Sequence, residues 1–301
     1  TLRPDDPIIT AYRDHGHALA RGMDPAIGMA ELFGRIGGCA KGKGGSMHFF
    51  DAEHHMYGGH GIVGAQVPLG AGLAFATKYR DEVLDGGKSS HVTLCFMGDG
   101  ATNQGAVHEA MNLATVLSLP VIFIVENNFY AMGTAIERCT AAGAHLVERA
   151  RGYDMDSATI QGMDVLDVYR GMKPLVDRCR ATSTPCFVDM HCYRFKGHSM
   201  SDPRKYRTHS EEEKWETKDP IELLAAHLVD QDMMTGEEFK ELGKEIRAEI
   251  REAVKWAQAS PETPMNELYH DVYADSWGPY TGTSVPEFLK RRSSDRGQDN
   301  A

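Results

Sequence analysis

The chain has 301 residues, of which 42% are hydrophobic and 25% charged, a composition typical of a folded protein with a sizeable core. Its net charge of −11 disfavours nucleic-acid binding, which requires clustered lysine and arginine side chains. The sequence contains no apolar run of about 18 residues and begins with the polar stretch Thr1–Pro7, so it predicts neither a membrane span nor a signal peptide.

The six cysteines form no C-x-x-C pair, and several of them lie in apolar runs. We therefore expect reduced, buried thiols in a reducing compartment and no zinc site. That compartment is the cytoplasm if the protein is bacterial, which we slightly prefer, and the mitochondrial matrix if it is eukaryotic.

Apolar runs of strand length alternate with helical patterns along most of the chain. Residues 26–60 are rich in glycine and histidine and predict loops after a short helix. The periodicity then predicts, in chain order, a helix at 67–79, a strand at 91–97, a helix at 102–117, strands at 121–125 and near 159–160, a helix at 165–179 and a strand at 186–190. This alternation indicates an α/β fold in which helices cover both faces of a parallel sheet.

The amino-acid composition of the sequence changes near Ser210. Residues 211–260 are charged and helical, with Ile246 and Ile250 among the apolar positions at helical spacing. We expect this segment to form a solvated helical cap on a single domain over residues 1–275, and residues 276–301 to form a flexible tail.

Polar groups follow two successive predicted strands at their carboxyl ends. Gly98-Asp99-Gly100 stands where one strand gives way to a helix, and Asn127-Asn128 follows the next strand. A right-handed crossover brings both groups to the edge of the sheet where ligands bind. Asp99 and Asn128 offer the oxygen ligands that Mg²⁺ or Ca²⁺ prefers. Because Gly100 and Ala101 are small, backbone N–H groups can approach a phosphate, so a diphosphate bridged by Mg²⁺ is a coherent ligand.

Gly-Asp-Gly followed after one crossover by Glu-Asn-Asn resembles the diphosphate-binding motif of thiamine-diphosphate enzymes. Further segments are similar to the alpha subunits of 2-oxoacid dehydrogenases, above all those that act on pyruvate: Gly37–His48, Tyr57–Leu69, Gly98–Glu109 and Gly197–Arg207. The match covers nearly the whole chain and fades after about residue 275. It implies the thiamine-diphosphate-binding fold, in its diphosphate-binding half.

The resemblance also implies roles for particular residues. Mg²⁺ would be held by Asp99, Asn128 and the backbone carbonyl of Tyr130. The cofactor would be bound by these metal ligands and by Tyr12, Arg13, Gly61, Val63, Gly98, Gly100, Ala101 and His198, with Ile62 packed beneath it. Gly61 and Val63 would contact the aminopyrimidine ring, Tyr12 and Arg13 would contact the diphosphate, and His198 would be an active-site histidine.

The same resemblance implies an oxidative decarboxylation in which thiamine diphosphate is the electron sink and the acyl group passes to a lipoyl-bearing acyltransferase component. The glutamate that protonates the aminopyrimidine ring has no candidate in this chain. In two-chain members it lies on a beta subunit, so we expect an obligate partner in a heterotetramer of two alpha and two beta chains.

Two departures from the family pattern bear on the site. The family's further N-terminal segment does not precede Leu2, so we expect either a truncated chain or a partner that fills the gap. His60 stands where the animal enzymes have Asn, which adds a titratable group. Ser199 and Ser201 match a loop that is phosphorylated in animal relatives, and here we expect it to be unmodified.

Other interpretations remain open at this point. The segment Gly37–Gly44 nearly matches the sequence motif of a phosphate-binding P-loop. However, Gly44 stands where Ser or Thr should bind Mg²⁺, and no strand is predicted before the segment. Within the family, branched-chain and acetoin dehydrogenases are close rivals, although Gly-His-Ser-Met-Ser-Asp-Pro favours pyruvate. A subunit that only binds partners is the alternative of a different class, and the intact pair of Asp99 and Asn128 argues against it.

Overall fold

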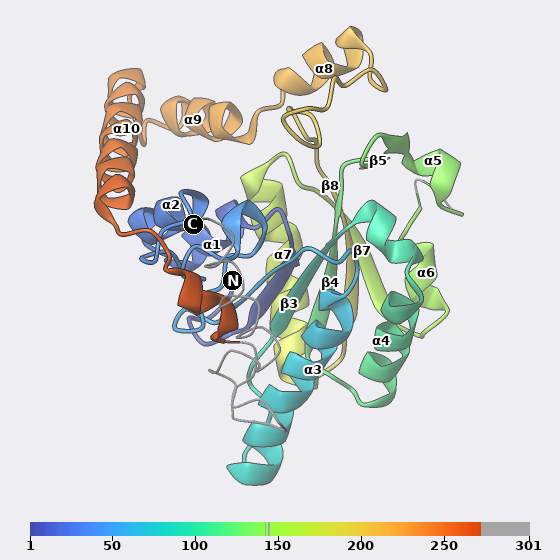
Figure 1. Ribbon diagram of the computed structural model, residues 1–301. Coiled ribbons are helices and arrows are strands. Elements are labelled where there is room, and N and C mark those ends of the chain that lie inside the picture. The colour runs from blue at the N-terminus through green and yellow to red at the C-terminus, as the bar shows by residue number, and fades with distance from the viewer. Residues whose placement is uncertain (142, 144, 272–301) are drawn as a thin grey trace, which may run out of the picture.

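A computed structural model of the chain describes residues 1–141, 143 and 145–271, and the tail predicted at 276–301 lies outside these residues. Its centre is a six-stranded, fully parallel sheet (Figure 1). In spatial order the strands are β2 (Met56–His60), β1 (Ile8–Ala11), β3 (Thr93–Gly98), β4 (Val121–Asn127), β8 (Cys186–His191) and β7 (Asp156–Gln161). The predicted α/β class is confirmed.

Helices cover both faces of this sheet (Figure 1). The chain forms the helices α1 (His15–Arg21), α2 (Pro25–Leu32), α3 (Gln66–Tyr79), α4 (Gly105–Val116), α5 (Ile136–Cys139), α6 (Glu148–Arg151), α7 (Val165–Thr182), α8 (His209–Glu216), α9 (Pro220–Asp230) and α10 (Gly236–Ala259). Shorter elements are a two-stranded antiparallel hairpin, β5 (Tyr130–Ala131) and β6 (Thr134–Ala135), and the helical turns η1 (Gly45–Met47), η2 (Arg80–Leu84), η3 (Asp99–Asn103) and η4 (Met265–Tyr269).

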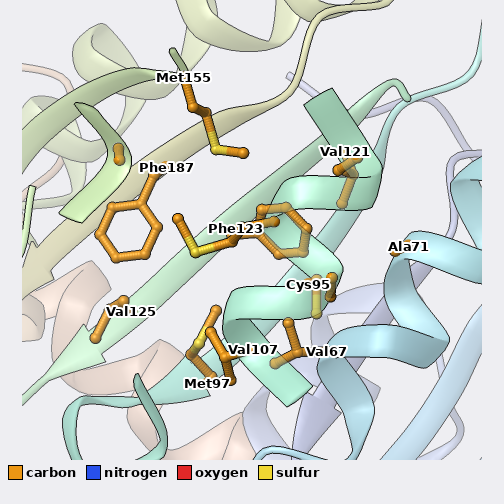
Figure 2. Packing of buried hydrophobic residues seen from close by; sticks show 14 of the residues in the cluster. Val67, Ala71, Cys95, Met97, Val107, Val121, Phe123, Val125, Met155 and Phe187 are labelled. Atoms are coloured by element: carbon orange, nitrogen blue, oxygen red, sulfur yellow. The ribbon is translucent and has the colours of Figure 1, made fainter. Parts of the chain in front are cut away.

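The core is divided between the two faces because alternate strand residues point to opposite sides. On one face, Phe123 and Met97 pack with Val107 of α4 and with α3 (Figure 2). On the other face, Ile122 packs with Val176 of α7. Apolar side chains on consecutive strand positions are therefore all buried, as the continuous hydrophobic runs predicted.

Two strands at one side of the sheet were not predicted. β1 is only four residues long, and β2 carries Gly58 and Gly59 within a segment that we had expected to be loop. Their pairing is non-local, since Ala11 of β1 lies opposite His60 of β2. Glycines have low strand propensity, so only this pairing reveals β2 as a strand. α2 also lies inside the predicted loop region.

The start of α4 differs from the prediction as well. We expected a helix from residue 102, but the chain first makes the tight turn η3, and Gln104 is extended with a ψ of 136° before α4 begins at Gly105. The turn lets Thr102 Oγ1 donate to the carbonyl of Asp99 at 2.6 Å. This local bond closes the turn at the residue on which the site depends.

The charged C-terminal segment forms α8, α9 and α10. α10 begins at a capping box between Thr235 and Glu238, and it packs against α2. Ala253 and Ala257 are buried, whereas Ile246 and Ile250 remain largely exposed. Within the part of the chain that the structure describes, no helix is both long and apolar enough to span a bilayer.

All six cysteines are free thiols. Cys95, Cys179 and Cys186 are buried, as expected, and Cys39 and Cys192 are partly buried. Cys139 is exposed, so the expectation of burial is wrong there. It lies in the short α5, whose single buried residue is Ile136.

Candidate cofactor and metal site

The residues predicted to bind the cofactor come together beyond the carboxyl ends of the parallel strands. Gly98 lies opposite Glu126 in the pairing of β3 with β4, so Asp99 and Asn127 leave the sheet side by side. In the same way Asn127 lies opposite His191, where β8 leads into the loop that carries His198. Tyr12 follows β1, and Gly61 follows β2. One edge of the sheet thus collects segments that are distant in the sequence.

Asp99 is the residue at this edge whose surroundings most clearly indicate a cation site. It is buried, with 3% of its surface exposed. Its Oδ1 accepts a hydrogen bond from the N–H of Gly100 at 2.8 Å, whereas its buried Oδ2 has no hydrogen-bond partner among the described residues. Burial raises the pKa of this carboxyl group, and the charge of Asp189 adds to the rise. A buried carboxylate oxygen without a partner is costly, and a cation would satisfy it.

The turn after β4 presents Asn128 and Tyr130. The side-chain oxygen of Asn128 accepts from the backbone N–H of Tyr130 at 3.1 Å, and that of Asn127 accepts from Phe129 at 3.0 Å. Phe129 adopts the left-handed conformation, with a φ of 65°. These bonds hold the turn in one shape, and the predicted ligands Asp99, Asn128 and the Tyr130 carbonyl all belong to this edge.

The described residues contain no group of three or more His, Cys, Asp or Glu side chains that could hold a metal ion. The predicted set is of another kind, because it has one carboxylate, one amide oxygen and one backbone carbonyl. Such oxygen ligands suit Mg²⁺, which usually keeps several water or phosphate ligands of its own. The unpartnered Oδ2 of Asp99 fits a metal that bridges the protein to a phosphate.

Glycines shape the space around this edge. A Cβ atom added to Gly98 would meet no atom within 4 Å, so the backbone there faces open space. A Cβ on Gly100 would lie 2.7 Å from the Cβ of Ala131 in β5, and one on Gly61 would lie 2.9 Å from the ring of His48. Gly100 is therefore required for packing against the hairpin, a reason that the sequence did not reveal.

His198 and the predicted diphosphate contacts lie together. Arg13 Nη2 donates to the backbone carbonyl of His198 at 2.9 Å, and the rings of Tyr12 and His198 meet edge to face at 5.9 Å. The Nδ1 atom of His198 is buried and has no hydrogen-bond partner within the described chain. Burial lowers the pKa of this histidine, and the charges of Arg13 and Arg194 lower it further. A neutral imidazole at the site follows from these surroundings.

The loop that carries His198 has its own internal supports. Asp202 accepts from the backbone N–H of His198 at 2.7 Å and from the hydroxyl of Tyr206 at 2.5 Å. Arg207 donates to the carbonyls of Arg194 and Lys196, which lie in the first part of the loop after β8. Ser199 and Ser201 are exposed, and their hydroxyl oxygens lie 3.2 Å apart.

The other predicted contacts lie farther along the same edge. Gly61 and Val63 follow β2, which is separated from β3 by β1. Ile62 is 76% exposed and Val63 is 43% exposed, so neither is covered by the described chain. His60 Nε2 donates to the carbonyl of Tyr57 at 3.2 Å, and its ring packs against the ring of Phe50.

Two charged residues near the site were missed in the sequence. His17 Nε2 lies 3.2 Å from Glu126 Oε1, directly before the Asn127-Asn128 pair. Burial acts to lower the pKa of His17, but the hydrogen bond and charge of Glu126 outweigh it and raise the pKa. His17 lies only four positions beyond Arg13, and this short spacing was the available signal.

The P-loop interpretation of residues 37–44 is wrong. The loop follows helix α2, whereas a P-loop follows a strand. The buried carboxylate of Glu31 accepts hydrogen bonds from the backbone N–H groups that a phosphate would need. Its four bonds, of 2.7 to 3.0 Å, come from the backbone of Ala40, Gly42, Gly44 and Gly45. The loop's lysines, Lys41 and Lys43, pair instead with Glu267 and Asp271.

Known proteins share this chain's sequence over most of its length. A relative from Rhizobium meliloti, named pyruvate dehydrogenase E1 component subunit alpha, is 47% identical over 272 residues, 90% of this chain and 76% of the relative. The protein of the same name from Zymomonas mobilis is 48% identical over 89% of this chain and 73% of its own length. The somatic, mitochondrial form from Bos taurus is 44% identical over 97% of this chain and 72% of its own.

The similarity to the bovine protein therefore extends past residue 275, beyond the segments that carry the family resemblance. The family described as dehydrogenase E1 component matches residues 1–266, which include every residue of the sheet and of its carboxyl edge. On the strength of that match and of these identities, the chain belongs to the dehydrogenase E1 component family.

Proposed function

We propose that this chain is the alpha subunit of a pyruvate dehydrogenase, which decarboxylates pyruvate oxidatively with thiamine diphosphate and passes the acetyl group to the lipoyl domain of an acyltransferase. The names of the relatives support the substrate. The observation that carries the proposal is the buried, unpartnered Oδ2 of Asp99 at the edge where the predicted cofactor residues meet.

In this proposal Asp99, Asn128 and the Tyr130 carbonyl would hold Mg²⁺, which would supply positive charge for an anionic diphosphate. Arg13 and Tyr12 contact the phosphate oxygens, since a guanidinium group suits forked contacts with phosphate. Gly98, Gly100 and Ala101 allow the backbone to approach the diphosphate closely. Gly61 and Val63 face the aminopyrimidine ring with backbone groups.

Bound thiamine diphosphate supplies the electron sink for decarboxylation. The protein's residues orient it and control protons beside it. His198 is held by the backbone bonds to Arg13 and Asp202, and its depressed pKa keeps the imidazole neutral, so that it can accept a proton at its free Nδ1. Arg13 and Arg194 add positive charge beside an anionic ligand.

A beta subunit completes the site in this proposal and supplies the catalytic glutamate. The edge is open in the single chain, and its rim is apolar: Ile62, Met132 and Met200 are exposed by 76%, 63% and 107%. Apolar side chains around a polar site are typical of a surface that a partner covers. The assembly would be a heterotetramer with two alpha and two beta chains, in the cytoplasm of a bacterium or in a mitochondrial matrix.

The test is to co-express the chain with its beta partner and to titrate the complex with thiamine diphosphate and Mg²⁺. Decarboxylation is followed by dye reduction with pyruvate, a branched 2-oxoacid and acetoin in parallel. We expect pyruvate to be preferred, and Asp99→Ala to lower activity by at least about a hundredfold, because residues that only support metal ligands already contribute about 10–100-fold and Asp99 would be a direct ligand.

Two results would overturn the proposal in different ways. Activity only with a branched substrate or with acetoin would keep the cofactor site and change the substrate. A complex that forms but neither binds the cofactor nor turns over any substrate would indicate a catalytically silent subunit.

A further inference from the structure

We propose that Asp189 is a positioning residue of the cation site, holding the Asn128 turn in its metal-binding shape through Asn127. Asp189 lies on β8 and is not one of the predicted ligands. The inference rests on the proposed function, since it assumes that Asp99 and Asn128 hold Mg²⁺.

The link begins with a chain of buried hydrogen bonds. Asp189 and Asn127 are both 0% exposed. Asn127 Nδ2 donates to Asp189 Oδ1 at 2.9 Å. The other oxygen of Asp189 lies 3.1 Å from His191 Nε2, two residues along the same strand. One oxygen of Asp189 therefore joins β8 to the end of β4, and the other contacts His191 within β8.

Asn127 passes this restraint to the turn. Its side-chain oxygen accepts from the N–H of Phe129 at 3.0 Å, and its backbone carbonyl accepts from Cys192 at 2.9 Å. Because Asp189 fixes the amide nitrogen of Asn127, the amide oxygen must point at Phe129. That bond stabilises the left-handed backbone of Phe129, which a bulky residue adopts rarely.

A third contact supports the same turn. The ring of Phe129 meets the ring of His191 edge to face at 5.1 Å, so both residues that flank Asn128 are tied to β8. Asn128 and the Tyr130 carbonyl are the predicted ligands on this turn. Without these ties to β8, the turn would keep the Asn128–Tyr130 bond and its contacts with the β5–β6 hairpin, but nothing would hold Asn127 and Phe129 against β8.

Charge gives Asp189 a second way to act on the metal. Asp189 on β8 and Asp99 after β3 are both buried, on the two strands that flank β4. Buried acidic groups on either side of a cation site favour the binding of a cation. In metal sites generally, residues that hold the ligands change metal affinity by about 10–100-fold when they are substituted.

Two substitutions separate position from charge. Asp189→Asn keeps an acceptor for Asn127 and removes the negative charge, whereas Asp189→Ala removes both. Asn127→Ala breaks the same link from its other end. The matched control is Asp156→Asn, because Asp156 begins β7 opposite Cys186, at the far end of the same sheet, and pairs with the surface residue Arg178.

The measurement is the Mg²⁺ concentration that half-saturates cofactor binding by the alpha–beta complex at a fixed, excess concentration of thiamine diphosphate. Binding is read by quenching of intrinsic fluorescence, and thermal unfolding of the metal-free complex is recorded for each variant. We expect half-saturation to rise about tenfold in Asp189→Asn and about 30-fold or more in Asp189→Ala and Asn127→Ala. At saturating Mg²⁺, kcat of Asp189→Asn should return to within about twofold of the wild-type value, because the ligands themselves remain.

The controls distinguish a failure of the proposed function from a failure of the positioning role of Asp189. If wild-type complex shows no Mg²⁺-dependent cofactor binding, the proposed function fails. If wild type binds, Asp99→Ala does not, and the variants of Asp189 and Asn127 bind Mg²⁺ like Asp156→Asn, the positioning role is overturned. Should Asp189→Ala fail to fold, Asn127→Ala breaks the same hydrogen bond from its other end and decides the question.

Discussion

Arg13 and His198, 185 residues apart in the sequence, are joined by a hydrogen bond of 2.9 Å from the Arg13 guanidinium to the His198 carbonyl. Arg13 follows β1, and His198 lies in the loop after β8, so two strands stand between theirs in the sheet. The bond therefore spans the carboxyl ends of β3 and β4. It links the predicted diphosphate contact to the predicted catalytic histidine.

Replacing Arg13 by Lys should weaken thiamine diphosphate binding about tenfold, because an ammonium group cannot make the forked contact of a guanidinium group. The measurement is a cofactor titration of the alpha–beta complex at saturating Mg²⁺. Arg151→Lys is the matched control, since the exposed side chain of Arg151 pairs with Glu148 on α6. Equal affinities for the two variants would remove Arg13 from the diphosphate site.

The pKa of His198 should lie below its ordinary value of 6.5, because burial and the charges of Arg13 and Arg194 disfavour the imidazolium form. Histidine NMR of the labelled protein, assigned with His198→Asn, measures it directly. In Arg194→Gln the pKa should rise, since one of the repelling charges is gone. A midpoint at or above 6.5 in the wild type would contradict the prediction.

The same shift has a consequence for stability. Between the folded pKa and 6.5 the unfolded chain binds the proton and the folded chain does not, so the free energy of unfolding falls as the pH drops through this window. Above 6.5 the penalty is absent. His198→Asn should therefore unfold in urea with a weaker dependence on pH below 6.5 than the wild type.

Glu31→Gln should lower the free energy of unfolding by about 2–4 kcal/mol, because a glutamine offers one acceptor oxygen where four buried N–H groups now share two. Urea unfolding measures the loss. Glu53→Gln on the exposed loop nearby is the control and should change little. A loss below about 0.5 kcal/mol would mean that water or a rearranged loop satisfies these groups.

Asp6→Asn should cost about 3–5 kcal/mol, because it leaves the guanidinium of Arg180 without its partner in a buried pair. Arg180 donates to both oxygens of Asp6, at 2.9 and 2.6 Å, and Asp6 is 0% exposed. The control is Asp177→Asn, whose solvent-exposed pair with Lys173 should contribute little to the free energy of unfolding. Equal losses in the two variants would contradict the buried pair's importance.

Acid titration tests the same pair. Burial raises the pKa of Asp6, but the bonds from Arg180 and from the backbone of Arg3 and Val92 outweigh it and lower the pKa below 3.8. The pair's contribution is therefore fully present above pH 3.8 and is lost as the pH falls through the folded pKa. In Asp6→Asn this acid-dependent part of the stability should disappear.

The sequence by itself indicated the parallel sheet, because strands buried on both faces are continuous apolar runs such as Val121–Val125. It also placed Asp99 and Asn128 at one edge, since a right-handed crossover leaves no other arrangement for two adjacent parallel strands. Both inferences follow from local pattern and from handedness, which do not require long-range contacts.

The tertiary structure alone decided the rest. The short strand β1 exists because it pairs with β2 on one side and β3 on the other, and neither β1 nor β2 has a periodic signal. The role of Glu31 depends on a loop folding back over α2, and Asp189 became relevant only when β8 paired beside β4. Buried polar groups act through partners that are distant in the sequence, and hydrogen-bond geometry is set only once the chain has folded around them.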